Sequence, residues 1–237
     1  MKVAVLGASG RAGSEITKEL AARGHTVTAI ARKPEAIPSA TGVTPVAGDA
    51  SDAAALADLI KGSDAVISAL HFDVPAATIL GALKTAGVPR LLVTGGAASL
   101  EVAPGVLLFD TPQFPAEWKP IAKGGLTFLD DLRQETDIDW TFFSPAALIE
   151  ETPRLGRYRT GTDQLVVDAN GDSKIGFSDY AIAMVDEFYE RHVKLIMSAV
   201  VPMTELYGDG LLNYEFKRCL SRLQEMQSHE YHARVHL

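Results

Sequence analysis

The feature that most constrains the fold is a glycine-spaced turn directly after an apolar run at the start of the chain. Residues 3–6 are typical of a buried strand, three glycines follow at intervals of three residues, and residues 14–23 favour a helix. A strand, a tight glycine turn and a helix N-terminus bind a pyrophosphate, because backbone N–H groups and the helix dipole favour an anion there. The alternative is a βα turn that is merely tight. The predicted cofactor-binding residues of this segment are Gly7, Ser9, Gly10, Arg11, Ala12 and Gly13.

Apolar runs and helical stretches alternate up to about residue 145. Near-continuous apolar strands separated by helices are typical of a parallel sheet covered on both faces. We therefore predict an α/β fold, a Rossmann-type doubly wound parallel sheet. The predicted strands are residues 3–6, 25–31, 43–47, 64–70, 90–94 and 139–144, and the predicted helices are residues 14–23, 52–61, 75–86 and 118–135, with Ser51 as the N-cap of the second.

The alternation ends after Pro145. Residues 154–175 hold three glycines among polar residues and the apolar run 165–167, which indicates loops and a strand. Residues 178–188 predict a helix with Ser178 as N-cap and Asp179 in its first turn. We expect an NAD(P)-binding domain at residues 1–202, with substrate-pocket segments 95–118 and 145–178, and a helical C-terminal extension at residues 203–237.

The last part of the chain has patterns of its own. Residues 195–201 are strand-like, and residues 211–227 have helical spacing with an apolar stripe. Such a stripe is expected to dock on the Rossmann body or on a second subunit. The extension beyond Pro202 is either an arm for a homodimer or a lineage-specific or artefactual addition. We predict no metal site, although His229, His232 and His236 share one helical face.

Composition limits the classes of function. The net charge of −8 and the lack of a basic stripe argue against nucleic acid as a partner. No apolar run approaches the ~20 residues of a membrane span, and a core strand at the N-terminus is not a cleaved signal peptide. Cys219 is the only cysteine, which fits a reducing cytoplasm. We expect a cytoplasmic protein that acts on a small molecule.

The residues after the second predicted strand indicate the nucleotide. An acid there binds the ribose 2′-hydroxyl of NAD, whereas cations accommodate the 2′-phosphate of NADP. The chain has Arg32 and Lys33 there, with Arg11 as a third cation, so NADP(H) is preferred over NAD(H). The alternative is that Arg32 and Lys33 are solvated loop charges. Further predicted contacts are Asp49 to the adenine, and Ser68, Ala69 and Leu70 to the ribose or nicotinamide.

Several segments resemble the atypical, NmrA-like short-chain dehydrogenase/reductases. They are residues 7–13, the position of Arg32 and residues 64–70, while residues 92–105, 110–115, 139–146 and 179–183 resemble the NADH-flavin reductase family of that group. The resemblance covers residues 1 to about 192. It implies a Rossmann-type fold, bound NAD(P)H and reduction of flavins or quinones, with FMN or FAD as substrate rather than as a prosthetic group.

One departure from the wider dehydrogenase pattern bears on mechanism. Those enzymes use a Tyr-x-x-x-Lys pair to exchange a proton with a carbonyl or alcohol, and none of the six tyrosines has a lysine four residues later. Hydride transfer to a flavin or quinone does not strictly need such a pair. Its absence fits a non-catalytic, NADP-binding redox sensor equally well, and counts against a weaker alternative, a sugar epimerase-like enzyme.

The remaining candidates follow the fourth, fifth and sixth predicted strands. Ser99 and His71 are the catalytic candidates, with a solvated loop histidine as the alternative for His71. Phe109, Phe114 and Trp118 are expected to form an apolar lid on which a flat ring stacks. The alternative is that these side chains pack in the core. The predicted nicotinamide contacts are Thr94, Gly95 and Gly96, and the predicted substrate pocket comprises Phe109, Phe114, Trp118, Ser144 and Pro145.

Overall fold

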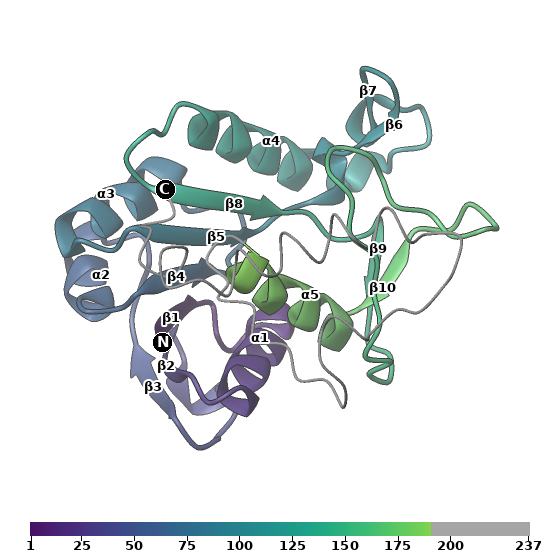
Figure 1. Cartoon of the computed structure of the whole chain (residues 1–237). Coiled ribbons are helices and arrows are strands. Elements are labelled where there is room, and N and C mark those ends of the chain that lie inside the picture. The colour runs from purple at the N-terminus through teal and green to yellow at the C-terminus, as the bar shows by residue number, and fades with distance from the viewer. Residues whose placement is uncertain (191–237) are drawn as a thin grey trace, which may run out of the picture. The chain divides into compact units, whose positions relative to one another are not determined.

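Six parallel strands form one sheet in the order β3-β2-β1-β4-β5-β8 in the computed structural model, which describes residues 1–190 (Figure 1). The strand order reverses between β1 and β4, as in doubly wound folds, and this confirms the predicted fold. The strands are β1 (Lys2–Leu6), β2 (Thr26–Ala31), β3 (Val43–Ala47), β4 (Ala65–Ser68), β5 (Arg90–Thr94) and β8 (Asp139–Phe143).

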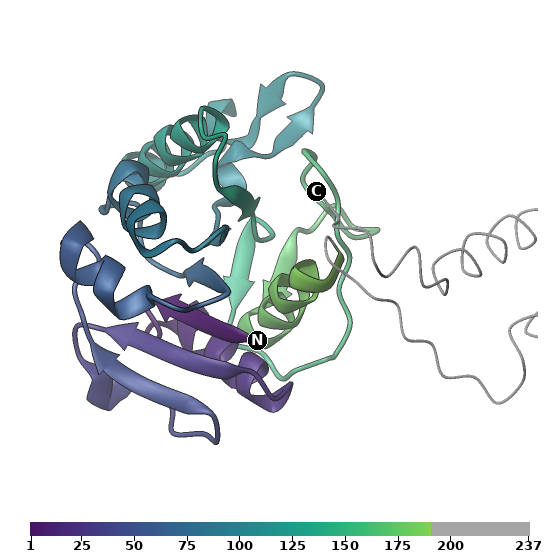
Figure 2. The same cartoon turned by 60° about the vertical axis from the view of Figure 1, so that its left-hand side comes forward.

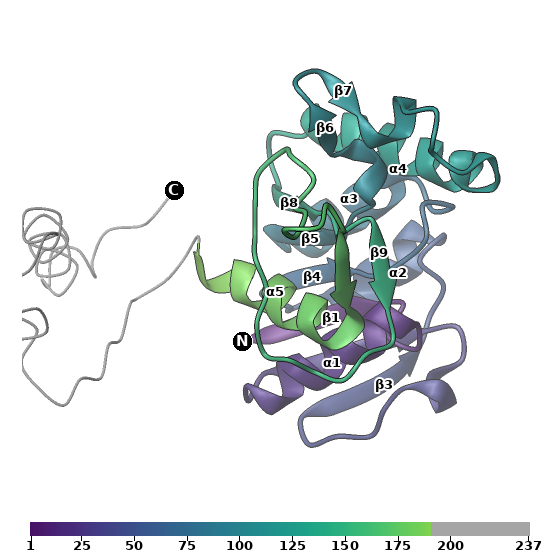
Figure 3. The ribbon, with the colours of Figure 1, turned by 90° about the vertical axis from the view of Figure 1, so that its right-hand side faces the viewer.

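Helices cover both faces of this sheet (Figure 3). On one face lie α1 (Arg11–Ala22) and α5 (Phe177–Glu190), and on the other lie α2 (Ala53–Ile60), α3 (Ala76–Ala86) and α4 (Lys119–Arg133). Ala4 and Leu6 of β1 pack in the core with α2, α3 and α4. Because side chains alternate along a strand, the equally buried Val3 and Val5 face α1 and α5.

Smaller elements lie outside the sheet. The strands β6 (Glu101–Ala103) and β7 (Val106–Leu107) form a hairpin that projects from the body (Figure 2). The strands β9 (Leu148–Glu150) and β10 (Lys174–Gly176) form a parallel pair. The 3₁₀ turns are η1 (Pro34–Ala36), η2 (Ala97–Ser99), η3 (Leu108–Asp110) and η4 (Ala116–Trp118).

Three local predictions were wrong. Asp52, not Ser51, caps α2, since its carboxylate accepts from Ala54 N and Ala55 N, at 3.1 and 3.0 Å. Ser178 is not an N-cap, because α5 begins one residue earlier and the Ser178 hydroxyl donates to Glu15 Oε2 at 2.8 Å. Residues 165–167 form no strand, whereas β10 lies at Lys174–Gly176.

The predicted strand 195–201, the helix 211–227, Cys219 and the three histidines lie outside the described residues. The domain boundary after residue 202 lies there too and stays a prediction.

Candidate functional site

The glycine turn between β1 and α1 is built for close approach of a ligand. Gly7 has a φ of +76°, and its N–H and that of Ala8 both donate to Ile30 O, at 2.9 and 3.1 Å. A Cβ on Gly13 would lie 2.1 Å from Gly7 O, so α1 can pack on the turn only if this residue is glycine. Gly10 N donates to Gly7 O at 2.9 Å and closes the turn.

The N-terminus of α1 has no side-chain cap. Its N-cap is Gly10, and its first turn holds no acidic residue. The N–H groups at a helix start have no partner within the helix, and the dipole makes that end electropositive. Ser9 is exposed and Ala12 half-buried beside them. This turn and this helix end fit the diphosphate of a dinucleotide.

The carboxyl ends of β1, β4 and β5 meet where the strand order reverses. Ser68 is buried, Thr94 Oγ1 donates to Ser68 O at 3.2 Å, and Ala69 N donates to the last residue of β1 at 2.9 Å. The Leu70 side chain lies 3.1 Å from where a Cβ on Gly7 would stand. Ligands of open α/β sheets bind at this reversal point. The structure thus brings the predicted ribose and nicotinamide residues to the glycine turn.

Three charged residues follow β2 and β3. Arg32 and Lys33 are exposed, and within the described residues neither side chain has an ion pair or hydrogen bond. Asp49 accepts from the N–H and the hydroxyl of Ser51, at 3.0 and 2.8 Å. These hydrogen bonds, with a smaller effect of the Arg32 charge, lower the pKa of Asp49 below its ordinary value. Arg32 and Lys33 directly follow β2, where the sequence predicts contacts with a 2′-phosphate. The preference for NADP(H) over NAD(H) stays a prediction.

Arg11, the third predicted cation, lies against the start of α5. Its guanidinium carbon is 5.1 Å from the ring centroid of Phe177, the first residue of α5. It also lines a cavity of about 440 Å³ beside the start of α1, called here the small cavity. The small cavity is lined by Arg11, Ser14, Glu15, Glu151, Thr152, Pro153, Phe177 and Ser178.

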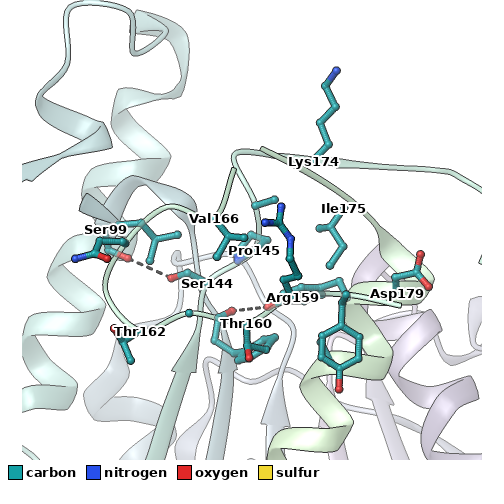
Figure 4. Close-up of a pocket in the computed structure, with 18 of the residues that line it drawn as sticks. Ser99, Ser144, Pro145, Arg159, Thr160, Thr162, Val166, Lys174, Ile175 and Asp179 are labelled. Carbon is teal, nitrogen blue, oxygen red and sulfur yellow. Dashed lines mark hydrogen bonds between the residues drawn. The ribbon is translucent and has the colours of Figure 1, made fainter. Parts of the chain in front are cut away.

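A second cavity, called here the large cavity, has a volume of about 860 Å³ and includes the residues that follow β8 (Figure 4). Cavities of this size hold small organic ligands. Its aromatic lining consists of Trp140, Phe142, Phe143, Tyr158 and Tyr180. The predicted Ser99, Ser144 and Pro145 also line it.

The predicted aromatic lid lies elsewhere. Phe109 and Phe114 pack against each other with ring centroids 5.5 Å apart, and the Trp118 residue is 50% exposed. None of the three is part of the lining of the large cavity. These side chains belong to the segment of η3 and η4, which connects the β6–β7 hairpin to α4.

Two hydroxyl groups face each other in the large cavity (Figure 4). Ser99 Oγ lies 3.2 Å from Ser144 Oγ and donates to Gly96 O at 3.0 Å. Because a serine has one hydroxyl proton, Ser144 is then the donor between the two oxygens, and its lone pairs are left for a ligand N–H. With the direction reversed, Ser144 keeps its proton for a ligand oxygen. The pair can therefore accept or donate.

The N–H of Gly95, a predicted nicotinamide contact, is used within the sheet. It donates to Phe143 O at 2.9 Å and extends the pairing of β5 with β8. Gly96 is half-buried and holds the Ser99 hydroxyl through its carbonyl.

Tyr180 is the most buried tyrosine of the site, and it is not poised to transfer a proton. Its hydroxyl donates to Phe143 O at 2.5 Å, and burial raises its pKa far above the ordinary value. Met184, not a lysine, stands four residues later. His71 is exposed in the segment after β4. Within the described residues no cluster of His, Cys, Asp or Glu could hold a metal ion.

Most of the wall of the large cavity comes from the predicted pocket segment 145–178, but no lining residue of this segment after Pro145 was singled out from the sequence as a site residue. Arg157 and Arg159 belong to the connection between β9 and β10, and Tyr180 belongs to α5, which follows β10. The strands β9 and β10 pair although they are more than twenty positions apart in the chain. The available signals were the two arginines within a polar segment and the 179–183 motif, and neither reveals a distant contact.

Comparison with known proteins agrees with this geometry. The NAD(P)H-binding family matches residues 7–189. YwnB of Bacillus subtilis, an uncharacterized protein, is 43% identical over 198 residues, 79% of this chain and 92% of YwnB. A proposed epimerase from Bacteroides thetaiotaomicron is 42% identical, with a TM-score of 0.75, over 79% of this chain and 90% of its own. A proposed NADH-flavin reductase from Streptococcus pneumoniae is 36% identical, with a TM-score of 0.71, over 81% and 94%.

The end of the chain is similar to a different group. The AFG1-like ATPase family matches residues 177–235. The cell division protein ZapE of Escherichia coli is 68% identical over 56 residues, which are 24% of this chain and 15% of ZapE. The AFG1-like match overlaps the NAD(P)H-binding match at residues 177–189.

No helix within the described residues is long and apolar enough to cross a bilayer. The glycine turn, the uncapped start of α1 and the reversal of strand order occur together in dinucleotide-binding sheets. With the family match over most of its length, the chain belongs to the NAD(P)H-binding family, as an NmrA-like protein of Rossmann fold.

Proposed function

We propose that the protein is an NADP(H)-dependent reductase that passes hydride to a planar acceptor such as a flavin or a quinone. The observation that carries this proposal is the large cavity, which has an aromatic wall and begins at β8, beside the sheet edge that fits the dinucleotide. When bound, the nicotinamide would supply the hydride. The relative from Streptococcus pneumoniae that is named as a proposed NADH-flavin reductase supports the same reaction class.

The chain's own residues would act by binding and orientation. The turn at Gly7 and the start of α1 would hold the diphosphate, and Arg32 and Lys33 the 2′-phosphate. The Ser99–Ser144 pair would offer a hydrogen bond to the acceptor, either as donor to an oxygen or as acceptor from an N–H. The proton that completes reduction would come from water, because Tyr180 is buried and bonded to Phe143 O.

The test is oxidation of NADPH and NADH under anaerobic conditions with FMN, FAD and simple quinones. We expect turnover with at least one acceptor and a preference for NADPH. The variant Ser144→Ala should lower kcat/KM about tenfold, the effect of losing one hydrogen bond in a transition state. Thr127→Ala, an exposed hydroxyl on α4, is the matched control. No turnover above background with any acceptor would contradict the proposal.

The second candidate is a redox sensor that binds NADP(H) without chemistry. Two observations favour it. The hydroxyl of Tyr180 is already bonded to Phe143 O, and no tyrosine of the chain has a lysine four residues later, as the Tyr-x-x-x-Lys pattern requires. Tight NADPH binding without oxidation by any acceptor would support this function instead. In either case we propose a cytoplasmic location, which the single cysteine suits.

A further inference from the structure

Residues 151–158, called here the strap, follow β9 and contact both α5 and α1. Three of its parts are held by carboxylates of these two helices. Arg154 Nη1 lies 2.5 Å from Glu19 Oε2 of α1, and the Tyr158 hydroxyl donates to Asp186 of α5. Between them, Leu155 N and Gly156 N both donate to Asp179 Oδ1, at 3.0 and 2.8 Å.

Asp179 is the central attachment and is unusual in its surroundings. It is 2% exposed, and its carboxylate accepts hydrogen bonds from two backbone N–H groups of the strap. A buried carboxylate is costly unless hydrogen bonds or dipoles compensate its charge. The strap N–H groups provide this compensation together with the N-terminus of α5, where Asp179 lies in the first turn. The charge of Asp179 therefore binds the strap to α5.

The strap lines both cavities. Asp179 binds it at Leu155 and Gly156, between the residues that line the small cavity and most of those that line the large one. Residues 151–153 line the small cavity beside the start of α1. Leu155, Arg157 and Tyr158 line the large cavity. The α5 residues divide in the same way, since Phe177 and Ser178 line the small cavity and Asp179 and Tyr180 the large one. Figure 4 shows Asp179 at the α5 end of the large cavity.

We infer that Asp179 is a positioning residue which, through the strap, sets the affinity of the protein for its dinucleotide and for its acceptor together. Freeing the strap would displace the wall beside Arg11 and the wall formed by Arg157 and Tyr158 at once. The part that concerns the acceptor rests on the proposed function. The part that concerns the dinucleotide rests on the site geometry alone.

The experiment compares Asp179→Asn with Glu135→Gln in the full chain. Glu135 is a matched control, because its carboxylate also accepts backbone N–H bonds, from Thr136, Asp137 and Ile138, but lines neither cavity. Both variants keep the side-chain shape and lose the charge. Trypsin cleavage after Arg154 and Arg157, followed by mass spectrometry, reports strap opening without any turnover.

For Asp179→Asn we expect cleavage within the strap to be about tenfold faster than for Glu135→Gln at equal thermal stability, because proteolysis follows the population of the open form. The Kd for NADPH and the KM for the acceptor should both rise several-fold, with a smaller change in kcat. NADPH should slow strap cleavage in the unaltered chain.

Unchanged strap cleavage and unchanged NADPH affinity in Asp179→Asn would overturn the inference. A loss of kcat alone, with both affinities preserved, would also overturn it. If no acceptor is turned over by any form of the protein, the proposed function fails, whereas faster cleavage and weaker NADPH binding would still uphold the role of Asp179 at the dinucleotide. If Asp179→Asn does not fold, Tyr158→Phe, which releases the far end of the strap, replaces it with the same expected directions.

Discussion

Gly13 and Gly81 both lie inside helices, but a Cβ would meet different surroundings at each. At Gly13 it would stand 2.1 Å from Gly7 O, whereas at Gly81 nothing lies within 4 Å. Gly13→Ala should therefore destabilise the fold by about 1–3 kcal/mol, as overpacking does. Gly81→Ala should stabilise it by about 0.5–1 kcal/mol through helix propensity. Urea unfolding of both variants measures this, and equal stabilities would show that α1 does not need glycine to pack on the turn.

Arg32 tests the choice of nucleotide. Arg32→Ala would remove a charge-assisted hydrogen bond to the 2′-phosphate, worth ~1.5–3 kcal/mol. NADPH binding should weaken roughly ten- to a hundredfold, while NADH binding stays nearly unchanged. Titration calorimetry with both nucleotides measures the difference, and Lys61→Ala, an exposed lysine at the end of α2, controls for net charge. Equal losses for both nucleotides would mean that Arg32 acts on the adenine or on folding.

At the scale of one helix, the start of α2 distinguishes two neighbouring residues. Asp52 accepts from two backbone N–H groups of the first turn, whereas the Ser51 hydroxyl donates to Asp49. Asp52→Ala should cost about 1 kcal/mol, as loss of an N-cap does, and lower Tm by about 2–4 °C. Ser51→Ala should change Tm much less. Thermal unfolding followed by circular dichroism measures both changes in Tm. A larger loss for Ser51→Ala than for Asp52→Ala would mean that Ser51 is the N-cap.

The sheet could be predicted from the sequence because each of its strands is a local apolar run. The predicted bounds of β3 and β5 agree with those observed. The bounds of β1, β2 and β8 differ by one residue at one end, and those of β4 by one residue at its start and two at its end. The pair β9–β10 could not be predicted, since its two short strands are separated by a long polar segment and only their pairing defines them. The glycine turn could be found because its spacing is local. The strap and its attachment to Asp179 join residues more than twenty positions apart, so the sequence did not reveal them.

Within the whole molecule, α5 is the element that both family matches share. The NAD(P)H-binding match ends at residue 189 and the ATPase match begins at residue 177. Tyr180, Met184 and Val185 are fully or almost fully buried, so this helix is part of the Rossmann core. We propose that the residues beyond it are an addition related to AFG1-like ATPases rather than a part of the NAD(P)H-binding domain.

This addition should bring no ATPase activity. ATP hydrolysis at a P-loop requires a motif of the form G-x-x-x-x-G-K-[ST], whose N–H groups and lysine hold the phosphates. No such motif occurs in the 237 residues. We expect no phosphate release from ATP above that of a heat-denatured sample, with a known ATPase as the positive control. Release that depends on protein concentration would contradict this.

The extent of the folding unit gives the last prediction. The six-stranded sheet and its five helices are complete by Glu190, so a chain shortened to end at Met203 should still fold and bind NADP(H), although its oligomeric state can change. A chain shortened to end at Gly176 is the control. It lacks α5, whose buried Tyr180, Ala181, Met184 and Val185 close one face of the sheet, and should lose its cooperative thermal transition. If the chain that ends at Met203 also unfolds without cooperativity, the residues beyond it belong to the core, and the boundary after residue 202 is wrong.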